Sequence, residues 1–181
     1  MIKLEAFQKE DFAQLIAWIN SEHLLTNWAG SLFSYPLTTD SLDWYIEDTN
    51  ELLGSDAFVY KAVDTDSGET VGHISLGSIS RKNRSGRISR VLVDKKCQGK
   101  GYCRQMVSAV LKIGFEELKL HRISLGVYDF NTAAIKCYQY AGMFTEGTNR
   151  ECLYFKGQWW SLIEMSMLEQ EWNEISKSAK L

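Results

Sequence analysis

The sequence predicts a mixed α/β fold, with a mostly antiparallel sheet in the first half and alternating helices and strands in the second. Three β-rich runs, 58–63, 71–76 and 87–93, are separated by short polar turns and indicate a meander. Behind the meander, amphipathic helical segments alternate with apolar strands. The chain has 181 residues, 45% hydrophobic and 24% charged, so a single domain over 1–181 can bury a full core.

The first elements follow from local patterns. Alternating apolar residues predict a strand over 2–6, and apolar residues at helical spacing predict a helix over 12–19. The only proline, Pro36, precedes a capped helix start at Thr39, and that helix continues to about 46. The aromatic-rich segment 26–37 between these two helices is expected to be turn-rich.

The second half of the chain shows the same periodicities and no internal repeat or linker. It predicts a helix from Tyr102 that fades near Leu118, then a strand over 122–127 and a helix over 132–140 that ends at a left-handed Gly142. Two strands are predicted over 152–155 and 161–168, on either side of the turn Lys156-Gly157. The last ten residues are expected to be frayed, apart from Trp172.

Charge and composition exclude several functional classes. The net charge of −3 and the lack of a basic stripe argue against a nucleic-acid surface, and the basic cluster 81–84 is explained by a solvated hairpin tip. No apolar run is long enough for a membrane span, and no secretory signal opens the chain, so a cytoplasmic protein is expected. The four cysteines show neither CxxC pairs nor zinc spacing, which predicts free thiols and no metal.

A glycine-containing loop follows the strand that ends at Val93. Gly99 and Gly101 allow a tight bend and a close approach to a ligand, and an amphipathic helix opens at Tyr102. The first N–H groups of a helix have no intrahelical partner, so the loop predicts an anion site. A nucleotide P-loop is excluded because no Gly-Lys-Ser/Thr follows, and a connection without a ligand is the alternative.

A second motif starts about thirty residues later. Asn131 suits the N-cap of the helix over 132–140, and Tyr138 lies seven residues on, two turns away on the same helix face. Taken alone, Asn131 could be a simple cap and Tyr138 a core side chain. Their order behind the glycine loop favours a shared ligand site instead.

Together the two motifs resemble those of the GNAT superfamily of N-acetyltransferases. Gln98, Gly101 and Cys103 follow its Gln-x-x-Gly-x-(Gly/Ala) loop, with Cys103 in place of the usual small residue, and Asn131 to Tyr138 follow its Asn-x-x-Ala-x-x-x-Tyr pattern. The resemblance is closest to the branch with ribosomal-protein N-terminal acetyltransferases and spermidine acetyltransferases. It implies a GNAT fold, with a mostly antiparallel twisted sheet of about seven strands, a splayed parallel pair and about four helices.

The resemblance also implies roles for single residues. Acetyl-CoA would be the co-substrate and no metal would take part. The backbone of Leu92 and Val93 would pair with the pantetheine arm, and Tyr138 would protonate the departing sulfur. Cys103 and Cys137 would pack without carrying an acyl group. The remaining cofactor-binding positions, mainly backbone amides around the pyrophosphate, would be Gln98, Gly99, Lys100, Gly101, Tyr102, Cys103, Arg104 and Asn131.

The acceptor depends on how its amine loses a proton. Many peptide-acetylating relatives carry a glutamate at the position of Gly126, so that acid is missing here. Deprotonating an α-amino group at pH 7 costs only ~1 kcal/mol, whereas a polyamine nitrogen costs about 4–5 kcal/mol. We therefore expect a peptide or protein N-terminus as acceptor, with polyamines second and aminoglycoside-like amines third.

The acceptor is expected between the first two helices and the final hairpin, where five aromatic residues could line its site: Trp28, Phe33, Tyr35, Trp44 and Trp159. Glu5, Glu69 and Glu151 are acids that the sequence does not place. A non-catalytic acyl-CoA sensor on the same fold is the rival hypothesis, and the presence of Tyr138 favours the enzyme. A homodimer is left open.

Overall fold

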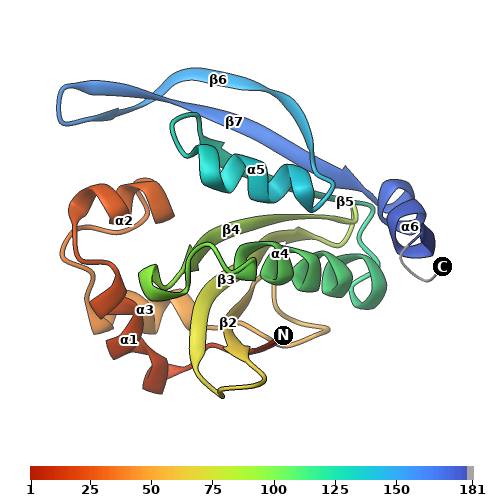
Figure 1. Ribbon diagram of the computed structural model, residues 1–181, viewed down its shortest axis with the longest axis horizontal. Helices are drawn as coiled ribbons and strands as arrows, with labels where there is room; N and C mark the ends of the chain where they lie inside the picture. Colours follow the sequence, from red (N-terminus) through yellow and green to blue (C-terminus); the bar gives the residue numbers. More distant parts are fainter. Residues whose placement is uncertain (179–181) are drawn as a thin grey trace.

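The computed structural model describes residues 1–178, and its centre is one seven-stranded sheet in the order β1-β2-β3-β4-β5-β7-β6 (Figure 1). Only β4 and β5 run parallel, which confirms the predicted, mostly antiparallel sheet. The strands are β1 (Ile2–Ala6), β2 (Phe58–Asp64), β3 (Thr70–Ser80), β4 (Ser85–Val93), β5 (Arg122–Tyr128), β6 (Phe144–Phe155) and β7 (Gln158–Leu168).

Within residues 1–178, six α-helices flank the sheet: α1 (Phe12–Trp18), α2 (Glu22–Ala29), α3 (Thr39–Ile46), α4 (Tyr102–Lys112), α5 (Thr132–Tyr140) and α6 (Glu169–Ser178). The predicted bounds of α5 and the start of α4 are confirmed. A π-helical turn continues α4 from Ile113 to Glu117, in agreement with a helix that fades near Leu118. Gly142 has the predicted left-handed backbone after α5, with a φ of +94°. Within the described range, no helix is long and apolar enough to cross a membrane.

Two helices were missed by the sequence analysis. Segment 26–37 begins inside α2, which starts where the Ser21 hydroxyl accepts the Leu24 N–H at 3.2 Å. Only Leu25 and Trp28 of this short helix are buried, so its sequence carries too short an apolar stripe to predict a helix. Where we expected frayed residues, α6 continues to residue 178, and its Trp172 ring stacks on Phe115 with centroids 5.8 Å apart. The expectation for residues 179–181 lies outside the described range.

The strand predicted over 152–155 is only the last part of β6, which starts at Phe144. Most residues of β6 are exposed, so the strand lacks the alternation of apolar and polar residues that reveals a half-buried strand. The long β6–β7 hairpin overhangs α2 (Figure 1). Its tip is tied to α2 by an ion pair between Lys156 and Glu22 at 2.6 Å.

Helices cover both faces of the sheet. A Cβ built on Gly72 of β3 would lie 2.7 Å from the Met106 sulfur of α4. The adjacent His73 contacts Trp28 of α2 and Tyr45 of α3, with ring centroids 5.4 Å and 5.8 Å away. Because neighbouring residues of a strand point to opposite faces, α4 covers one face and α2 and α3 cover the other.

The parallel pair separates soon after it begins. β4 and β5 are paired only from Ser85–Arg87 to Arg122–Ser124, and the rest of each strand leaves this neighbour. A register shift against β3 and a φ of +53° at Arg90 bend β4 at this point. The splay predicted from the family resemblance is therefore present, and it leaves one backbone edge of β4 free.

Candidate functional site

A cavity of about 740 Å³ opens where β4 and β5 separate. Its walls come from both strands, the loop before α4, the first turn of α4, helix α5 and helix α2. The cavity brings together ten of the eleven site residues predicted from the sequence: Leu92, Val93, Gln98, Gly99, Gly101, Tyr102, Cys103, Arg104, Asn131 and Tyr138. The eleventh, Lys100, has an exposed side chain and does not line the cavity.

The loop before α4 is shaped by two left-handed glycines. Gly99 and Gly101 have φ values of +77° and +78°, and a Cβ at either position would meet no atom within 4 Å. Glycine is needed there for the backbone conformation rather than for lack of space. Gly101 caps α4, so the N–H groups of the first helical turn have no helical partner and line one end of the cavity. This end can bind an anion.

The first residue of α4 is held by a strand on the other side of the loop. The Tyr102 hydroxyl donates a hydrogen bond to the Asp64 carboxylate of β2. This bond raises the pKa of Tyr102 to about 12 and lowers the pKa of Asp64 to about 2. The Tyr102 side chain therefore anchors the start of α4 to the sheet. This contact also holds the preceding loop, which forms part of the cavity wall.

The other wall carries Asn131 and Tyr138. The Asn131 side-chain oxygen accepts the Ala134 N–H at 3.3 Å, so the predicted N-cap is confirmed. Tyr138 is only 6% exposed and lies on the cavity wall. Burial raises the pKa of the Tyr138 phenol well above its usual value. The phenol is therefore protonated at neutral pH and can donate a proton or a hydrogen bond.

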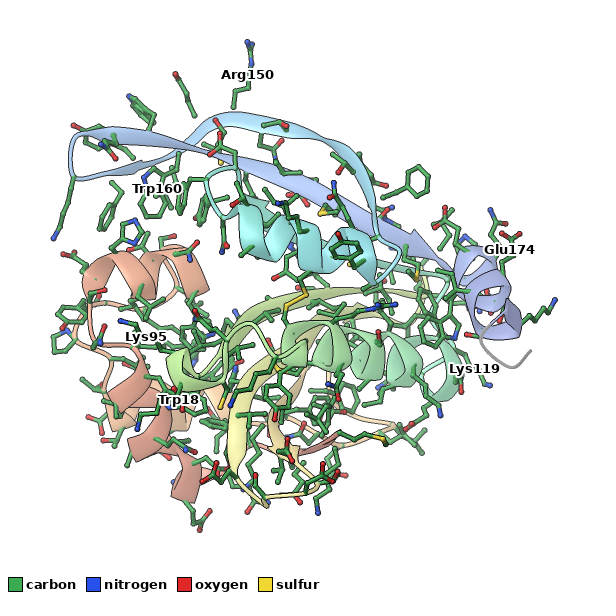
Figure 2. The ribbon with its side chains drawn as sticks, viewed as in Figure 1. Trp18, Lys95, Lys119, Arg150, Trp160 and Glu174 are labelled. Carbon is green, nitrogen blue, oxygen red and sulfur yellow. A yellow bond between two sulfur atoms is a disulfide. The ribbon has the colours of Figure 1, made fainter. Side chains whose placement is uncertain are left out.

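The prediction of four free thiols is wrong for two of them. Cys103 of α4 and Cys137 of α5 form a disulfide, visible as the yellow bond between these helices in Figure 2. The two residues are 34 positions apart in the sequence, and only the packing of α4 beside α5 brings their Cα atoms to 6.4 Å. Bonded to each other, neither sulfur can carry an acyl group. Cys97 and Cys152 are free thiols.

An ion pair fills the place of the missing strand acid. A Cβ on Gly126 would lie 2.5 Å from a terminal nitrogen of Arg87. Arg87 reaches past this glycine to Glu164 of β7, with two hydrogen bonds of 2.8 Å and 3.1 Å. Gly126 thus makes room for the pair, and a carboxylate held by a guanidinium is a poor base.

The three unplaced acids lie away from the cavity. Glu5 is paired with Lys3 at 2.6 Å, Glu69 lies in the turn between β2 and β3, and Glu151 lies on the β6–β7 hairpin. None of them is among the residues that line the cavity. Over residues 1–178, no group of three or more His, Cys, Asp or Glu side chains could hold a metal ion.

The five aromatic residues predicted near the acceptor have different positions. Trp28 lines the cavity, and Phe33 stacks behind it with ring centroids 5.7 Å apart. Tyr35, Trp44 and Trp159 are exposed and do not line the cavity. The sequence analysis missed Asn27 because it missed α2, and it missed Arg90 because no local pattern marks a bend in β4.

Comparison with known proteins assigns the chain to a family. Residues 2–144 match the family described as "Acetyltransferase (GNAT) domain". The N-acetyltransferase YokL of Bacillus subtilis is 30% identical over 138 residues, which cover 76% of this chain and 75% of YokL. The chain belongs to the GNAT acetyltransferases. It is therefore an acetyltransferase, as the two sequence motifs predicted, and this favours the enzyme over the sensor hypothesis.

Other GNAT relatives cover nearly the whole chain. The spermidine N(1)-acetyltransferase of Vibrio cholerae is 24% identical over 171 residues, 94% of this chain and 95% of that enzyme. Its crystal structure with CoA and spermine superposes with a TM-score of 0.81 at 22% identity, covering 95% and 98% of the two chains. YdaF of Bacillus subtilis, named as a candidate ribosomal N-acetyltransferase, is 30% identical over 105 residues, covering 58% and 57% of the chains. The predicted GNAT fold and branch are confirmed.

Proposed function

We propose that this GNAT protein transfers the acetyl group of acetyl-CoA directly to a primary amine, and that the amine is the α-amino group of a peptide or protein. The observation that carries the proposal is the single cavity shared by the glycine loop and Tyr138. An anion site and a buried proton donor thereby lie on opposite walls of the gap between β4 and β5.

The fit to CoA rests on the backbone. The edge of β4 that carries Leu92 and Val93 is free of β5, so its N–H and C=O groups can pair with the amides of a pantetheine arm, as a strand would. The unpaired N–H groups at the start of α4 suit a pyrophosphate. Arg104 adds positive charge on the cavity wall, whereas the exposed Lys100 can contribute only from outside.

In the transfer step, the amine nitrogen attacks the thioester carbonyl carbon and the carbon–sulfur bond breaks. The electron pair of that bond stays on the sulfur, to which the Tyr138 hydroxyl donates a hydrogen bond or its proton. After a proton transfer, water returns a proton to the phenolate. A positioned acid of this kind contributes roughly 10²–10⁴-fold to a rate. The proton of the amine passes to water, because no carboxylate is found among the residues of the cavity wall within the described range.

Two observations bear on the acceptor in opposite directions. Relatives that match almost the whole chain are named spermidine acetyltransferases, which favours a polyamine. The cavity wall, however, carries Arg90 on the sheet face that α2 and α3 cover and, as far as the structure describes it, no acid. A polycation would meet like charge there without a counter-charge, so an amine with a single positive charge is the better match.

The loop assignment is tested by thermal unfolding with and without acetyl-CoA. Acetyl-CoA should raise the melting temperature of the wild type, because a ligand that binds only the folded state stabilises it. Gly101→Glu should abolish this increase, since it puts a carboxylate at the anion site. Gly157→Glu is the control, because Gly157 has a comparable φ of +87° at the far hairpin turn. An undiminished increase in the Gly101 variant would contradict the assignment.

A further inference from the structure

Arg90 is a cation without a counter-charge on the acceptor side of the cavity. Its guanidinium carbon lies 4.8 Å from the centre of the Tyr45 ring, a cation–π contact that holds the side chain in place. Its Nε atom is buried and has no hydrogen-bond partner among the described residues. No carboxylate of residues 1–178 forms an ion pair with it.

The backbone of Arg90 is fixed as well. His73 Nδ1 lies 2.9 Å from the Arg90 carbonyl oxygen, and burial keeps the His73 ring neutral at pH 7, so Nδ1–H donates this bond. The bond lies at the bend of β4, where Arg90 has a φ of +53°. The guanidinium is therefore positioned before any substrate arrives.

Trp28 adds a second free donor beside Arg90. Its side chain is only 6% exposed, it lines the same cavity, and its buried Nε1–H has no partner within the described part of the chain. Trp28 and Arg90 are linked through Tyr45, whose ring contacts the indole with centroids 6.4 Å apart. The cavity wall thus includes two side chains, one of them charged, that each have a buried donor atom without a partner among the described residues. Donors of this kind bind a carboxylate.

The place of these donors in the cavity points to the acceptor rather than to CoA. Arg90 and Trp28 lie on the sheet face that α2 and α3 cover, whereas the loop of Gly99 and Gly101 precedes α4 on the opposite face. The hairpin tip closes over α2 at this end, with the His23 and Trp160 rings 5.1 Å apart. Arg90 and Trp28 therefore belong to the part of the cavity wall that lies on the face of α2 and α3.

We propose that the acceptor is a primary amine that also carries a carboxylate, and that Arg90, with the Trp28 N–H, binds this carboxylate. The carboxylate belongs either to an acidic residue at the start of a peptide or to a free amino acid. This inference rests on the proposed function and specifies its substrate class.

The test measures kcat/KM with saturating acetyl-CoA and thiol release as readout. Two peptides that differ only in Asp or Asn as first residue compare carboxylate with amide, and free aspartate and spermidine complete the panel. The wild type should prefer the Asp to the Asn peptide by roughly 10–100-fold, the value of a charge-assisted hydrogen bond. A preference for free aspartate over both peptides would support the carboxylate and assign it to a free amino acid.

Two variants locate the effect. Arg90→Gln should lower kcat/KM for the Asp peptide much more than for the Asn peptide and so remove most of the preference, and Arg90→Lys should retain part of it. Arg150→Gln is the matched control, because this exposed arginine points away from the molecule on β6 (Figure 2) and its loss changes net charge equally. If Arg90→Gln does not fold, the comparison of the Asp and Asn peptides with the wild type still tests the carboxylate site.

The outcomes distinguish a failure of the carboxylate site from a failure of the proposed acetyl transfer. Turnover with equal use of the Asp and Asn peptides, or with spermidine preferred to both, would overturn the carboxylate site and leave acetyl transfer intact. Equal losses for the two peptides in Arg90→Gln would also overturn it. Acetyl-CoA binding without turnover of any acceptor in the panel would overturn the inference together with the proposed amine transfer.

Discussion

Tyr138 is buried and still lies on the cavity wall, and these two properties decide what its hydroxyl can do. Burial raises the pKa of the phenol, so the hydroxyl keeps its proton throughout the neutral range. Among residues 1–178, no side chain or backbone group forms a hydrogen bond with this hydroxyl, and burial is what raises its pKa. A group of this kind is useful mainly when charge develops on the departing sulfur.

Tyr138→Phe is therefore expected to lower kcat by about 10²-fold or more while acetyl-CoA affinity changes little. Steady-state kinetics and calorimetric titration with acetyl-CoA measure the two quantities separately. Tyr154→Phe, on the exposed face of the hairpin, is the control and should keep full activity. Equal kcat values in the Tyr138 variant and the wild type would mean that water protonates the thiolate.

At the level of elements, the cavity depends on how α4 and α5 are held beside each other. The disulfide between Cys103 and Cys137 joins the first turn of α4 to α5 close to Tyr138. It closes a chain segment of 34 residues that contains β5. The bond thus connects the two walls to which we assign the anion site and the proton donor.

Reduction of this disulfide should lower the free energy of unfolding by about 4 kcal/mol, because the unfolded chain regains the freedom of the closed segment. Thermal unfolding with and without a thiol reductant measures the change, and Cys137→Ala should make it disappear. Cys152→Ser is the control, since Cys152 is a free thiol. The alkylation of four thiols in the folded, untreated protein would contradict the bond.

Activity tests the chemical role of the same cysteines. Cys103→Ala and Cys137→Ala should both remain active, because in the proposed mechanism the amine attacks the thioester directly. A loss of activity together with a trapped acetyl-thioester on the remaining cysteine would replace direct transfer by a two-step route.

For the whole molecule, the second core, formed by α1, α2 and α3 against the sheet, surrounds the imidazole ring of His73. His73 is only 1% exposed and lies among Phe7, Trp28 and Tyr45. Burial lowers its pKa from 6.5 to about 4, with a further decrease from the Arg90 charge opposed by the hydrogen bond to the Arg90 carbonyl and by Asp11. Stability should consequently depend on pH.

Between pH 6.5 and about 4, the unfolded chain binds a proton at this histidine and the folded chain does not. The free energy of unfolding should therefore fall as the pH is lowered, by about 2 kcal/mol between roughly pH 7.5 and pH 5. Urea unfolding at both values measures this, and His73→Asn should reduce the difference. His121→Asn is the control because that ring is 52% exposed.

The two acids with the most strongly lowered pKa values do not change the free energy of unfolding appreciably in this pH range. Asp64 and Glu146 have pKa values lowered to about 2 by their hydrogen bonds to Tyr102 and Arg122. A carboxylate with a lowered pKa loses its contribution only below its unfolded pKa, 3.8 for Asp64 and 4.5 for Glu146. A wild-type stability that stays constant down to pH 5 would show that the His73 ring is not buried as described.

The sequence by itself determined the features that depend on neighbouring residues. The glycine loop, the helix that starts at Tyr102, the N-cap at Asn131 and the strand periodicities are local, because a backbone conformation or a helix end is specified within a few residues. The order of the two motifs along the chain then sufficed for the fold and the family.

Tertiary structure decided what depends on distant segments. The sequence did not predict α2, because only Leu25 and Trp28 of this short helix are buried. It predicted only the last part of β6, because most of that strand is exposed. Three contacts join residues from different elements: the Cys103–Cys137 disulfide, the Arg87–Glu164 ion pair beside Gly126, and the cation–π contact of Arg90 with Tyr45. Contacts of this kind form only when the chain packs, since no pattern within a single segment specifies which side chains will meet.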